Sequence, residues 1–463
     1  MRVLSVTAGA AGMYCGSCLR DNALAAELLS RGHDVTLLPL YTPTLTDEAN
    51  VSHARVLFGG IGVYLQQKYR IFRTLPRFVD RLLDHPGMIR TFAERSVSVD
   101  PRFLGDMTVS MLEGRDGVLR REFHKLFEWL NGEPRPDIVN LPNSLLIGLA
   151  QPIREALGCP VVCTLQGEDL FLSGLLEPYR TRSLDLIRAQ VPHVDRFIAV
   201  SHFCATFMSG HLRIPEDRMS VVPLGIDLRA YEGQDGRVGR EGQVGREGQE
   251  GTFRVGYFAR VAPEKGLKLL AEAYIRFRGR RPEARARLEA AGYLATADRP
   301  YLESVRQLMQ KAGLGGEFHY HGAVDLQRKV SFLRSLDMLS VPAAYDEPKG
   351  IFLLEAMAAG VPVVQPRRGA FIEVVERTRA GLLVAPDDPD ALAHGIETQF
   401  QEADSRRAMG RRGAESVRHH YSIQCSADKL LGVYEETTGY RLQASGTSQS
   451  SRGNSGHEPK PAA

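Results

Sequence analysis

Two series of short apolar segments, each alternating with stretches long enough for helices, constrain the fold of this 463-residue chain. The first series opens with a predicted buried strand over 2–7 and a Gly-rich turn. A helix follows, with apolar residues Leu24, Leu28 and Leu29 at helical spacing, ends at Arg31-Gly32, and leads to a second strand over 33–40. This strand–helix–strand opening is typical of a doubly wound parallel sheet. Further strands are expected at 137–141, 160–165 and 196–200.

The second series starts at Phe253, where Phe-Arg-Val-Gly-Tyr-Phe predicts another first strand. Later strands are expected at 287–291, 318–321, 338–341, 361–365 and 381–384. The length alone allows two or three domains at about 100–200 residues each. Because the two series are similar in size, the sequence predicts an α/β protein with two Rossmann-like domains.

The segment between the two series has an unusual composition. Glycine recurs at every third position from Gly233 to Gly251, and Val-Gly-Arg-Glu-Gly-Gln occurs twice. The run has no proline and is too short for a collagen triple helix, so we expect a flexible hydrophilic linker. The Ser- and Gly-rich tail after about Gln443 is expected to be disordered by composition.

Composition excludes several classes of protein. With 58 Lys+Arg and 55 Asp+Glu the formal net charge is only +3, which argues against a dedicated nucleic-acid binder. Six cysteines in so long a chain do not form a disulfide framework and indicate free thiols in a reducing compartment, so a cytoplasmic location is expected. No stretch approaches the roughly 18–20 apolar residues of a membrane span.

One basic segment leaves two interpretations open. Residues 68–90 carry six Lys/Arg and two Asp, interleaved with apolar side chains at helical spacing. Such a surface can rest on the anionic headgroups at the inner face of a membrane or hold an anionic acceptor. Alternatively, it is a solvated helix whose apolar stripe packs on its own domain.

The strongest local motif is Tyr-Asp-Glu-Pro-Lys-Gly-Ile-Phe-Leu-Leu-Glu-Ala-Met-Ala-Ala-Gly-Val-Pro-Val-Val at 345–364. A helix is expected to begin near Gly350, which places Glu355 about 7.5 Å along it and leaves Glu347 in the preceding loop. The exposed amides at the start of this helix form an anion site between the two carboxylates; they belong to Gly350, Ile351 and Phe352. A nucleotide-diphosphate sugar fits such a site.

A second motif, Phe-Ala-Arg-Val-Ala-Pro-Glu-Lys-Gly, occupies residues 258–266 at the end of the first strand of the second series. Arg260 and Lys265 are expected to converge on the crevice at the strand ends, where open α/β sheets bind ligands. Two fixed cations there can stabilise a departing diphosphate.

Together these residues resemble family 4 of the retaining glycosyltransferases, which have the GT-B fold. Further support comes from Val-Val-Pro-Leu-Gly-Ile-Asp at 221–227, Val-Ser-His-Phe at 200–203 and Arg-Gly-His-Asp-Val at 31–35. The resemblance implies that Glu355 holds the donor ribose, and that Glu347 holds the donor sugar beside the reacting carbon. It also implies that the diphosphate lies on Arg260 and Lys265, without a metal or a further cofactor.

The resemblance also assigns residues of the first domain. Gly16 is retained from the family's first-loop glycine pair, Gly12 is an additional upstream glycine, and the amides of this loop are expected to reach the donor. Gln166 stands where many members have His, and its neutral amide can hydrogen-bond the donor or acceptor but cannot act as a base. Lys349 stands where the family usually has Phe. The candidate catalytic residues are therefore Glu347, Gln166, Lys265 and Arg260.

The resemblance implies a domain organisation with a last helix that crosses back to the first domain. The expected boundaries are an N-terminal acceptor domain over 1–222 with a helical insertion at about 56–130, a crossing and linker over 223–252, a donor domain over 253–415, the crossing helix over 416–440 and a tail over 441–463. The expected partners are a nucleotide-sugar donor and a hydroxyl acceptor, which is a glycan, a lipid-linked molecule or a small molecule.

Other functions remain open at this point. A non-catalytic protein that binds nucleotide sugars or carbohydrates would keep the same fold, and an epimerase or a phosphorylase of GT-B architecture would use similar residues. Cys15 and Cys18 have the spacing of a redox motif, but the surrounding sequence is not thioredoxin-like. A nicotinamide dehydrogenase would use the loop of Gly9, Gly12 and Gly16, yet the second strand ends without an acidic residue for a ribose.

Overall fold

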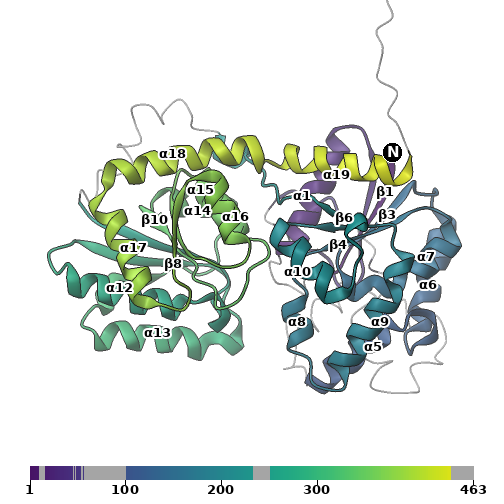
Figure 1. Ribbon diagram of the computed structural model, residues 1–463, viewed down its shortest axis with the longest axis horizontal. Helices are drawn as coiled ribbons and strands as arrows, with labels where there is room; N and C mark the ends of the chain where they lie inside the picture. Colours follow the sequence, from purple (N-terminus) through teal and green to yellow (C-terminus); the bar gives the residue numbers. More distant parts are fainter. Residues whose placement is uncertain are drawn as a thin grey trace, which may run out of the picture.

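The computed structural model describes residues 1–9, 16–44, 46, 48–53, 56, 101–232 and 251–439 (Figure 1). Several sequence-based predictions concern residues outside these ranges and stay predictions. They are those for Gly12, for Cys15, for the basic segment 68–90, for the glycine-rich run and for the tail.

Two six-stranded sheets, both with only parallel pairs, form the cores of the two domains. The first has the order β2-β1-β3-β4-β5-β6, and the second has the order β12-β11-β10-β7-β8-β9. The strands of the first sheet are β1 (Arg2–Thr7), β2 (Asp34–Pro39), β3 (Ile138–Leu141), β4 (Val161–Leu165), β5 (Arg196–Ala199) and β6 (Met219–Val221). Those of the second are β7 (Phe253–Phe258), β8 (Ala286–Ala291), β9 (Phe318–Tyr320), β10 (Met338–Leu339), β11 (Val363–Pro366) and β12 (Gly381–Val384).

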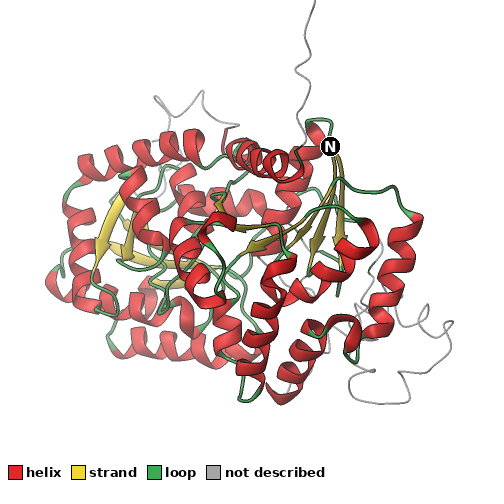
Figure 2. Ribbon diagram, turned by 45° about the vertical axis from the view of Figure 1, so that its right-hand side comes forward, coloured by secondary structure: helices red, strands yellow, loops and turns green. Residues whose placement is uncertain are grey.

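Helices cover both faces of each sheet (Figure 2), as expected for sheets of parallel strands. The helices of the first domain are α1 (Gly16–Ser30), α5 (Pro101–Leu112), α6 (Arg120–Gly132), α7 (Ala150–Leu157), α8 (Asp169–Ser173), α9 (Tyr179–Gln190), α10 (His202–Leu212) and α11 (Arg229–Glu232). The remaining helices are α12 (Leu267–Arg280), α13 (Arg299–Lys311), α14 (Leu326–Arg334), α15 (Ile351–Ala358), α16 (Ala370–Thr378), α17 (Pro389–Gln401), α18 (Ala403–His420) and α19 (Ile423–Thr438). The predicted α/β architecture with two doubly wound domains is therefore confirmed.

The strands differ from the sequence-based expectation at one edge. β6 was not among the expected strands, because its three residues are only half-buried and give no apolar run. In α1, Leu24 and Leu28 are buried as expected, whereas Leu29 is 39% exposed. Leu29 follows Leu28 by one residue, which turns its side chain by about 100° away from the buried stripe.

The chain crosses between the domains twice, and backbone hydrogen bonds join the two crossing segments. α18 packs on α15 of the second domain, and α19 packs on α1 of the first (Figure 1). Between these helices, the Tyr421 carbonyl accepts from the Ile226 amide at 2.9 Å, and the Ile423 amide donates back to the Ile226 carbonyl at 2.9 Å. Ser422 begins α19 as its N-cap, with its side chain accepting from the Cys425 amide.

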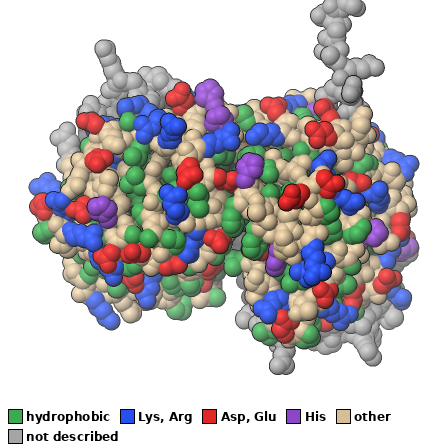
Figure 3. All heavy atoms as spheres, viewed as in Figure 1, with side chains coloured by type: hydrophobic (Ala, Val, Ile, Leu, Met, Phe, Trp, Pro, Cys, Tyr) green, Lys and Arg blue, Asp and Glu red, His purple; other side chains and the backbone are tan. Residues whose placement is uncertain are grey.

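The surface carries charges of both signs. Figure 3 shows Lys and Arg side chains interspersed with Asp and Glu over both domains on the face that it presents, in keeping with the net charge of +3. Within the described part of the chain, none of the helices combines the length and the apolar character that a membrane crossing requires.

The contact between the crossing segments yields a prediction for Gly225. A Cβ at Gly225 would lie 2.5 Å from the Ser422 carbonyl oxygen and 2.8 Å from Ile423 Cα. Because both are backbone atoms, we expect Gly225→Ala to lower the free energy of unfolding by about 1–3 kcal/mol, as overpacking does. The matched control is Gly432→Ala in α19, where a Cβ meets nothing within 4 Å.

Thermal unfolding of both variants measures the difference. Gly432→Ala is expected to be neutral or stabilising by up to about 1 kcal/mol, as for a helical glycine with free space around its Cβ. Equal melting temperatures for the two variants would contradict the close approach of the crossing segments.

Candidate functional site

A buried ion pair lies where the loop after β7 meets the loop before α15. Lys265 Nζ is 2.6 Å from Glu347 Oε2 and 2.5 Å from Tyr345 Oη. The Tyr345 hydroxyl donates to the same carboxylate oxygen at 2.5 Å. Glu347 is only 4% exposed and Lys265 and Tyr345 are half-buried, so the buried carboxylate is satisfied by two polar groups that lie between it and the surface.

The charge state of Glu347 follows from these neighbours. Burial by itself would raise the pKa of the Glu347 carboxyl, but the Lys265 ammonium and the Tyr345 hydroxyl outweigh burial and hold that pKa below its ordinary value. Burial and the adjacent carboxylate raise the pKa of the Tyr345 hydroxyl. Glu347 is therefore an anion and Tyr345 a neutral hydrogen-bond donor at neutral pH.

Two glycines allow the loops to approach so closely. Gly266 has φ 78°, and a Cβ there would lie 2.0 Å from the Pro342 carbonyl oxygen. Gly369 has φ 54°, and a Cβ there would lie 2.6 Å from the Glu347 carbonyl oxygen. Only glycine tolerates both this backbone conformation and this lack of space for a side chain. Gly266 and Gly369 therefore allow the loops that carry Lys265 and Glu347 to lie in contact.

The helix predicted after Glu347 is present. α15 begins at Ile351 with Gly350 as its N-cap at φ 70°, so the amides of Gly350, Ile351 and Phe352 lie at the start of the helix. Glu355, in the second turn, is buried, and its Oε1 is 2.7 Å from Lys329 Nζ. Lys329 comes from α14 and is itself buried, so the second carboxylate also has a cationic partner.

Arg260 lies apart from the buried pair. Its guanidinium is bonded to Glu264, one turn further along the same loop, and its side chain is 45% exposed. Of the two cations predicted to meet the diphosphate, Lys265 therefore contacts Glu347 directly, whereas Arg260 contacts Glu264 in the state described.

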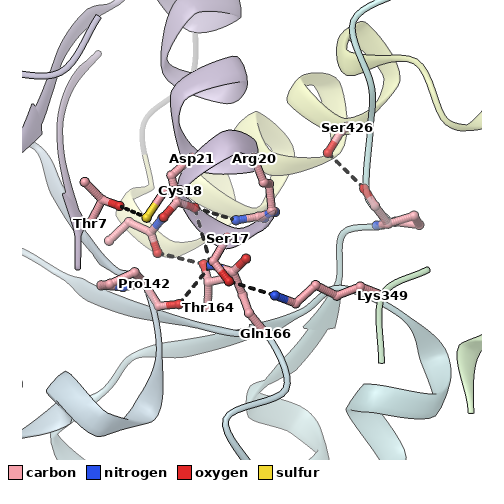
Figure 4. Close-up of polar contacts among 12 residues, drawn as sticks. Thr7, Ser17, Cys18, Arg20, Asp21, Pro142, Thr164, Gln166, Lys349 and Ser426 are labelled. Carbon is pink, nitrogen blue, oxygen red and sulfur yellow. Dashed lines mark hydrogen bonds and ion pairs between the residues drawn. The ribbon is translucent and has the colours of Figure 1, made fainter. Parts of the chain in front are cut away.

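The first domain contributes Gln166, directly after β4 (Figure 4). Its Nε2 donates to the Pro142 carbonyl at 3.0 Å and lies 3.4 Å from Asp21 Oδ1, and its backbone amide donates to Glu168 Oε2 at 2.8 Å. Because both Nε2 partners are acceptors, the orientation of the amide is fixed. Gln166 Oε1 is buried and has no hydrogen-bond partner among the described residues, so this acceptor is unsatisfied in the structure.

Gly16 is the first residue of α1, in the same domain as Gln166. Beside it, the Ser17 hydroxyl accepts a hydrogen bond from Lys349 Nζ of the other domain at 2.7 Å (Figure 4). Gly12 lies outside the described residues. The structure thus brings Gly16 and Gln166 to one side and the Glu347 loop to the other, with Lys349 reaching across.

Sequence reasoning missed several members of this site. Tyr345 stands in the quoted motif two residues before Glu347, so its position was visible although its role was not. Lys329 and Asp21 come from distant segments, and no local pattern links them to Glu355 or to Gln166. Such partners become apparent only once the sheet topology brings their elements together.

Cys18, Cys163 and His321 fit structural roles. The Cys18 thiol is buried and accepts from Thr7 Oγ1 at 3.7 Å. Burial raises the pKa of the Cys163 thiol well above its ordinary value, which favours the unreactive thiol. His321 Nε2 lies 2.7 Å from Glu289 Oε2, so this histidine has a carboxylate partner.

Comparison with known families gives two matches along the chain. Residues 106–230 match the model described as Glycosyltransferase Family 4, and residues 244–416 match the model described as Glycosyl transferases group 1. The first covers about half of the first domain, from α5 to α11, and the second covers the whole second sheet.

The chain spans about half the length of the curated relatives that it matches. The chain is 28% identical over 229 residues to the D-inositol 3-phosphate glycosyltransferase of Corynebacterium efficiens, which is 49% of this chain and 53% of that protein. It is 31% identical over 187 residues to the phosphatidyl-myo-inositol mannosyltransferase of Mycolicibacterium smegmatis, which is 40% and 45% of the two chains.

Solved structures share the fold over nearly the whole chain. Sucrose-phosphate synthase from Thermosynechococcus elongatus has a TM-score of 0.68 at 16% identity, covering 95% of this chain and 99% of that chain. Anabaena HepE in complex with UDP has a TM-score of 0.63 at 15% identity, covering 94% and 100%. These likenesses confirm the GT-B fold. The two family matches show that the chain belongs to the family 4 glycosyltransferases.

Proposed function

We propose that the protein is a retaining glycosyltransferase that moves a sugar from a nucleotide-diphosphate-sugar donor to a hydroxyl acceptor. The observation that carries this proposal is the buried Lys265–Glu347 pair, held at 2.6 Å beside the start of α15. A pair at this place offers a carboxylate to sugar hydroxyls and a cation to a diphosphate.

The donor subsite follows from the same residues. The diphosphate would lie against the first amides of α15, where the helix dipole favours negative charge, and would take Lys265 and Arg260 as counter-charges. Glu355 would accept hydrogen bonds from the ribose hydroxyls, with Lys329 Nζ 2.7 Å from Oε1 of that carboxylate and holding it in place. On the other side of the crevice, the amides at Gly16 and of the loop that contains Gly12 would approach the donor.

The chemical step would use few protein groups. The bond between the anomeric carbon and the diphosphate oxygen breaks, the bond from that carbon to the acceptor oxygen forms on the same face, and the acceptor proton passes to the leaving phosphate oxygen. Lys265 and Arg260 neutralise the charge that develops on the diphosphate, so we propose transfer without a metal. Glu347 orients the donor sugar relative to the acceptor, and Gln166 Oε1 accepts a hydrogen bond from a donor or acceptor hydroxyl.

Named relatives narrow the choice of ligands for the first experiments. HepE was solved with UDP and with UDP-glucose, and a mannosyltransferase of Mycobacterium tuberculosis is named as GDP-mannose-dependent. The relatives named above act on inositol phosphate or phosphatidyl-inositol acceptors. UDP- and GDP-sugars, with inositol-type and sugar acceptors, are therefore the first ligands to test, followed by ADP-sugars.

A donor screen with thermal unfolding tests the proposal. A nucleotide sugar at 100 times its dissociation constant is expected to add about 2.7 kcal/mol of stability, whereas the free nucleoside, which lacks the diphosphate, should add far less. With the donor that binds, transfer should persist in EDTA, and NMR of the product should show that it keeps the anomeric configuration of the donor.

Binding without turnover for every donor and acceptor would instead support a non-catalytic binding protein. Inversion, donor epimerisation or phosphorolysis would each point to another GT-B enzyme.

Removal of either partner of the buried pair is expected to disable transfer. Glu347→Gln and Lys265→Met should each reduce kcat/KM at least about 100-fold, the scale of a lost preorganised electrostatic contact. Glu376→Gln is the matched control, because Glu376 forms an exposed ion pair with Arg367 on the same domain. Steady-state transfer assays on folded variants measure the effect, and near-normal turnover by Glu347→Gln would refute the assignment.

A further inference from the structure

The dipeptide Pro348-Lys349, directly after Glu347, is held by the first domain at three points. The Ser201 hydroxyl donates to the Pro348 carbonyl at 2.8 Å, and this contact is buried. Lys349 Nζ donates to the Ser17 hydroxyl at 2.7 Å. The third point is Gly167, whose missing side chain leaves room for the Pro348 ring.

The contact at Gly167 leaves no spare room. A Cβ on Gly167 would lie 2.3 Å from Pro348 Cγ, far inside the separation of about 3.5–4.0 Å at which carbon atoms pack. Gly167 follows Gln166 in the chain, and Pro348 follows Glu347. The two candidate site residues on opposite sides of the crevice are therefore each one residue away from the point where the domains touch.

A neighbouring contact extends this strip. The amide of His202, the first residue of α10, donates to Glu373 Oε2 of α16 at 3.0 Å. The Ser201 hydroxyl also caps α10 by accepting from the Cys204 amide at 3.0 Å. This second bond orients the hydroxyl toward the Pro348 carbonyl. The first domain thus presents a rigid surface to the Glu347 loop.

We propose that Gly167 and Pro348 are positioning residues of the transfer site: the seating of the Pro348 ring on Gly167 sets the distance between Glu347 and Gln166 when the domains are closed. The catalytic part of this inference rests on the proposed function, whereas the docking itself does not. A displacement of the ring by more than about 1 Å would move Glu347 with it, and misplacement on that scale can cost about 100-fold in rate.

The test uses Gly167→Ala in the full-length protein. We expect small-angle X-ray scattering to give a larger radius of gyration than for the wild type, because the new Cβ and the Pro348 ring cannot occupy the same space. We expect kcat for transfer to fall about 100-fold, while the affinity for UDP or GDP, whichever stabilises the wild type more, changes less than about threefold.

Two further variants separate docking from other effects. In Gly167→Ala combined with Pro348→Ala, Cγ and Cδ are gone, and the remaining Cβ of residue 348 would lie at an ordinary 3.5 Å from the new Cβ. This double variant should recover the wild-type radius and at least about tenfold of the lost kcat. Gly32→Ala is the matched control: Gly32 has φ 82°, near the 90° of Gly167, but a Cβ there meets nothing within 4 Å.

Each outcome decides the proposal. Three results would overturn the proposal: an unchanged radius of gyration in Gly167→Ala, no recovery of radius and kcat in the double variant, or the same expansion in Gly32→Ala. In each case backbone strain or a shifted Gln166 would explain the loss of kcat instead. If no donor supports transfer by the wild type, the scattering results still decide the docking, and only the proposed function fails.

Discussion

The Lys265–Glu347 ion pair is the interaction on which the rest of the site depends. A buried pair is stabilising only with good geometry and further hydrogen bonds, because both charges have lost their water. Here the Tyr345 hydroxyl supplies the further bond, and Gly266 and Gly369 allow the backbone to come close enough. Removal of either charge leaves the other buried and uncompensated. Under the proposed function, an incoming diphosphate would therefore share Lys265 with Glu347, so that the carboxylate keeps its cationic partner.

The second constraint is the arrangement of the two domains. The crossing segments are hydrogen-bonded to each other at Ile226, whereas the opposite side of the crevice is held by the contacts of Pro348 and Lys349. The covalent connections and the candidate site thus lie at different places along the interface. Closure of such a crevice excludes water from a reactive donor, which is what a transferase needs in order to avoid hydrolysis.

Much of the fold could be predicted because buried parallel strands are continuous apolar runs, which stand out in a sequence. The exceptions are physical: β6 is a half-buried edge strand, and Leu29 lies next to the apolar stripe without belonging to it. In the site, Glu347 and Glu355 were predictable because a single local motif contains both. Lys329 and Gly167 were not, since their importance arises from contacts with segments far away in sequence.

A crystal structure of the protein with a bound nucleoside diphosphate tests the central claim most directly. The account predicts that the diphosphate lies at the start of α15, with Lys265 Nζ within about 3 Å of a phosphate oxygen and no longer bonded to Glu347 alone. A diphosphate bound elsewhere, with the Lys265–Glu347 pair still at the 2.6 Å described here, would contradict it.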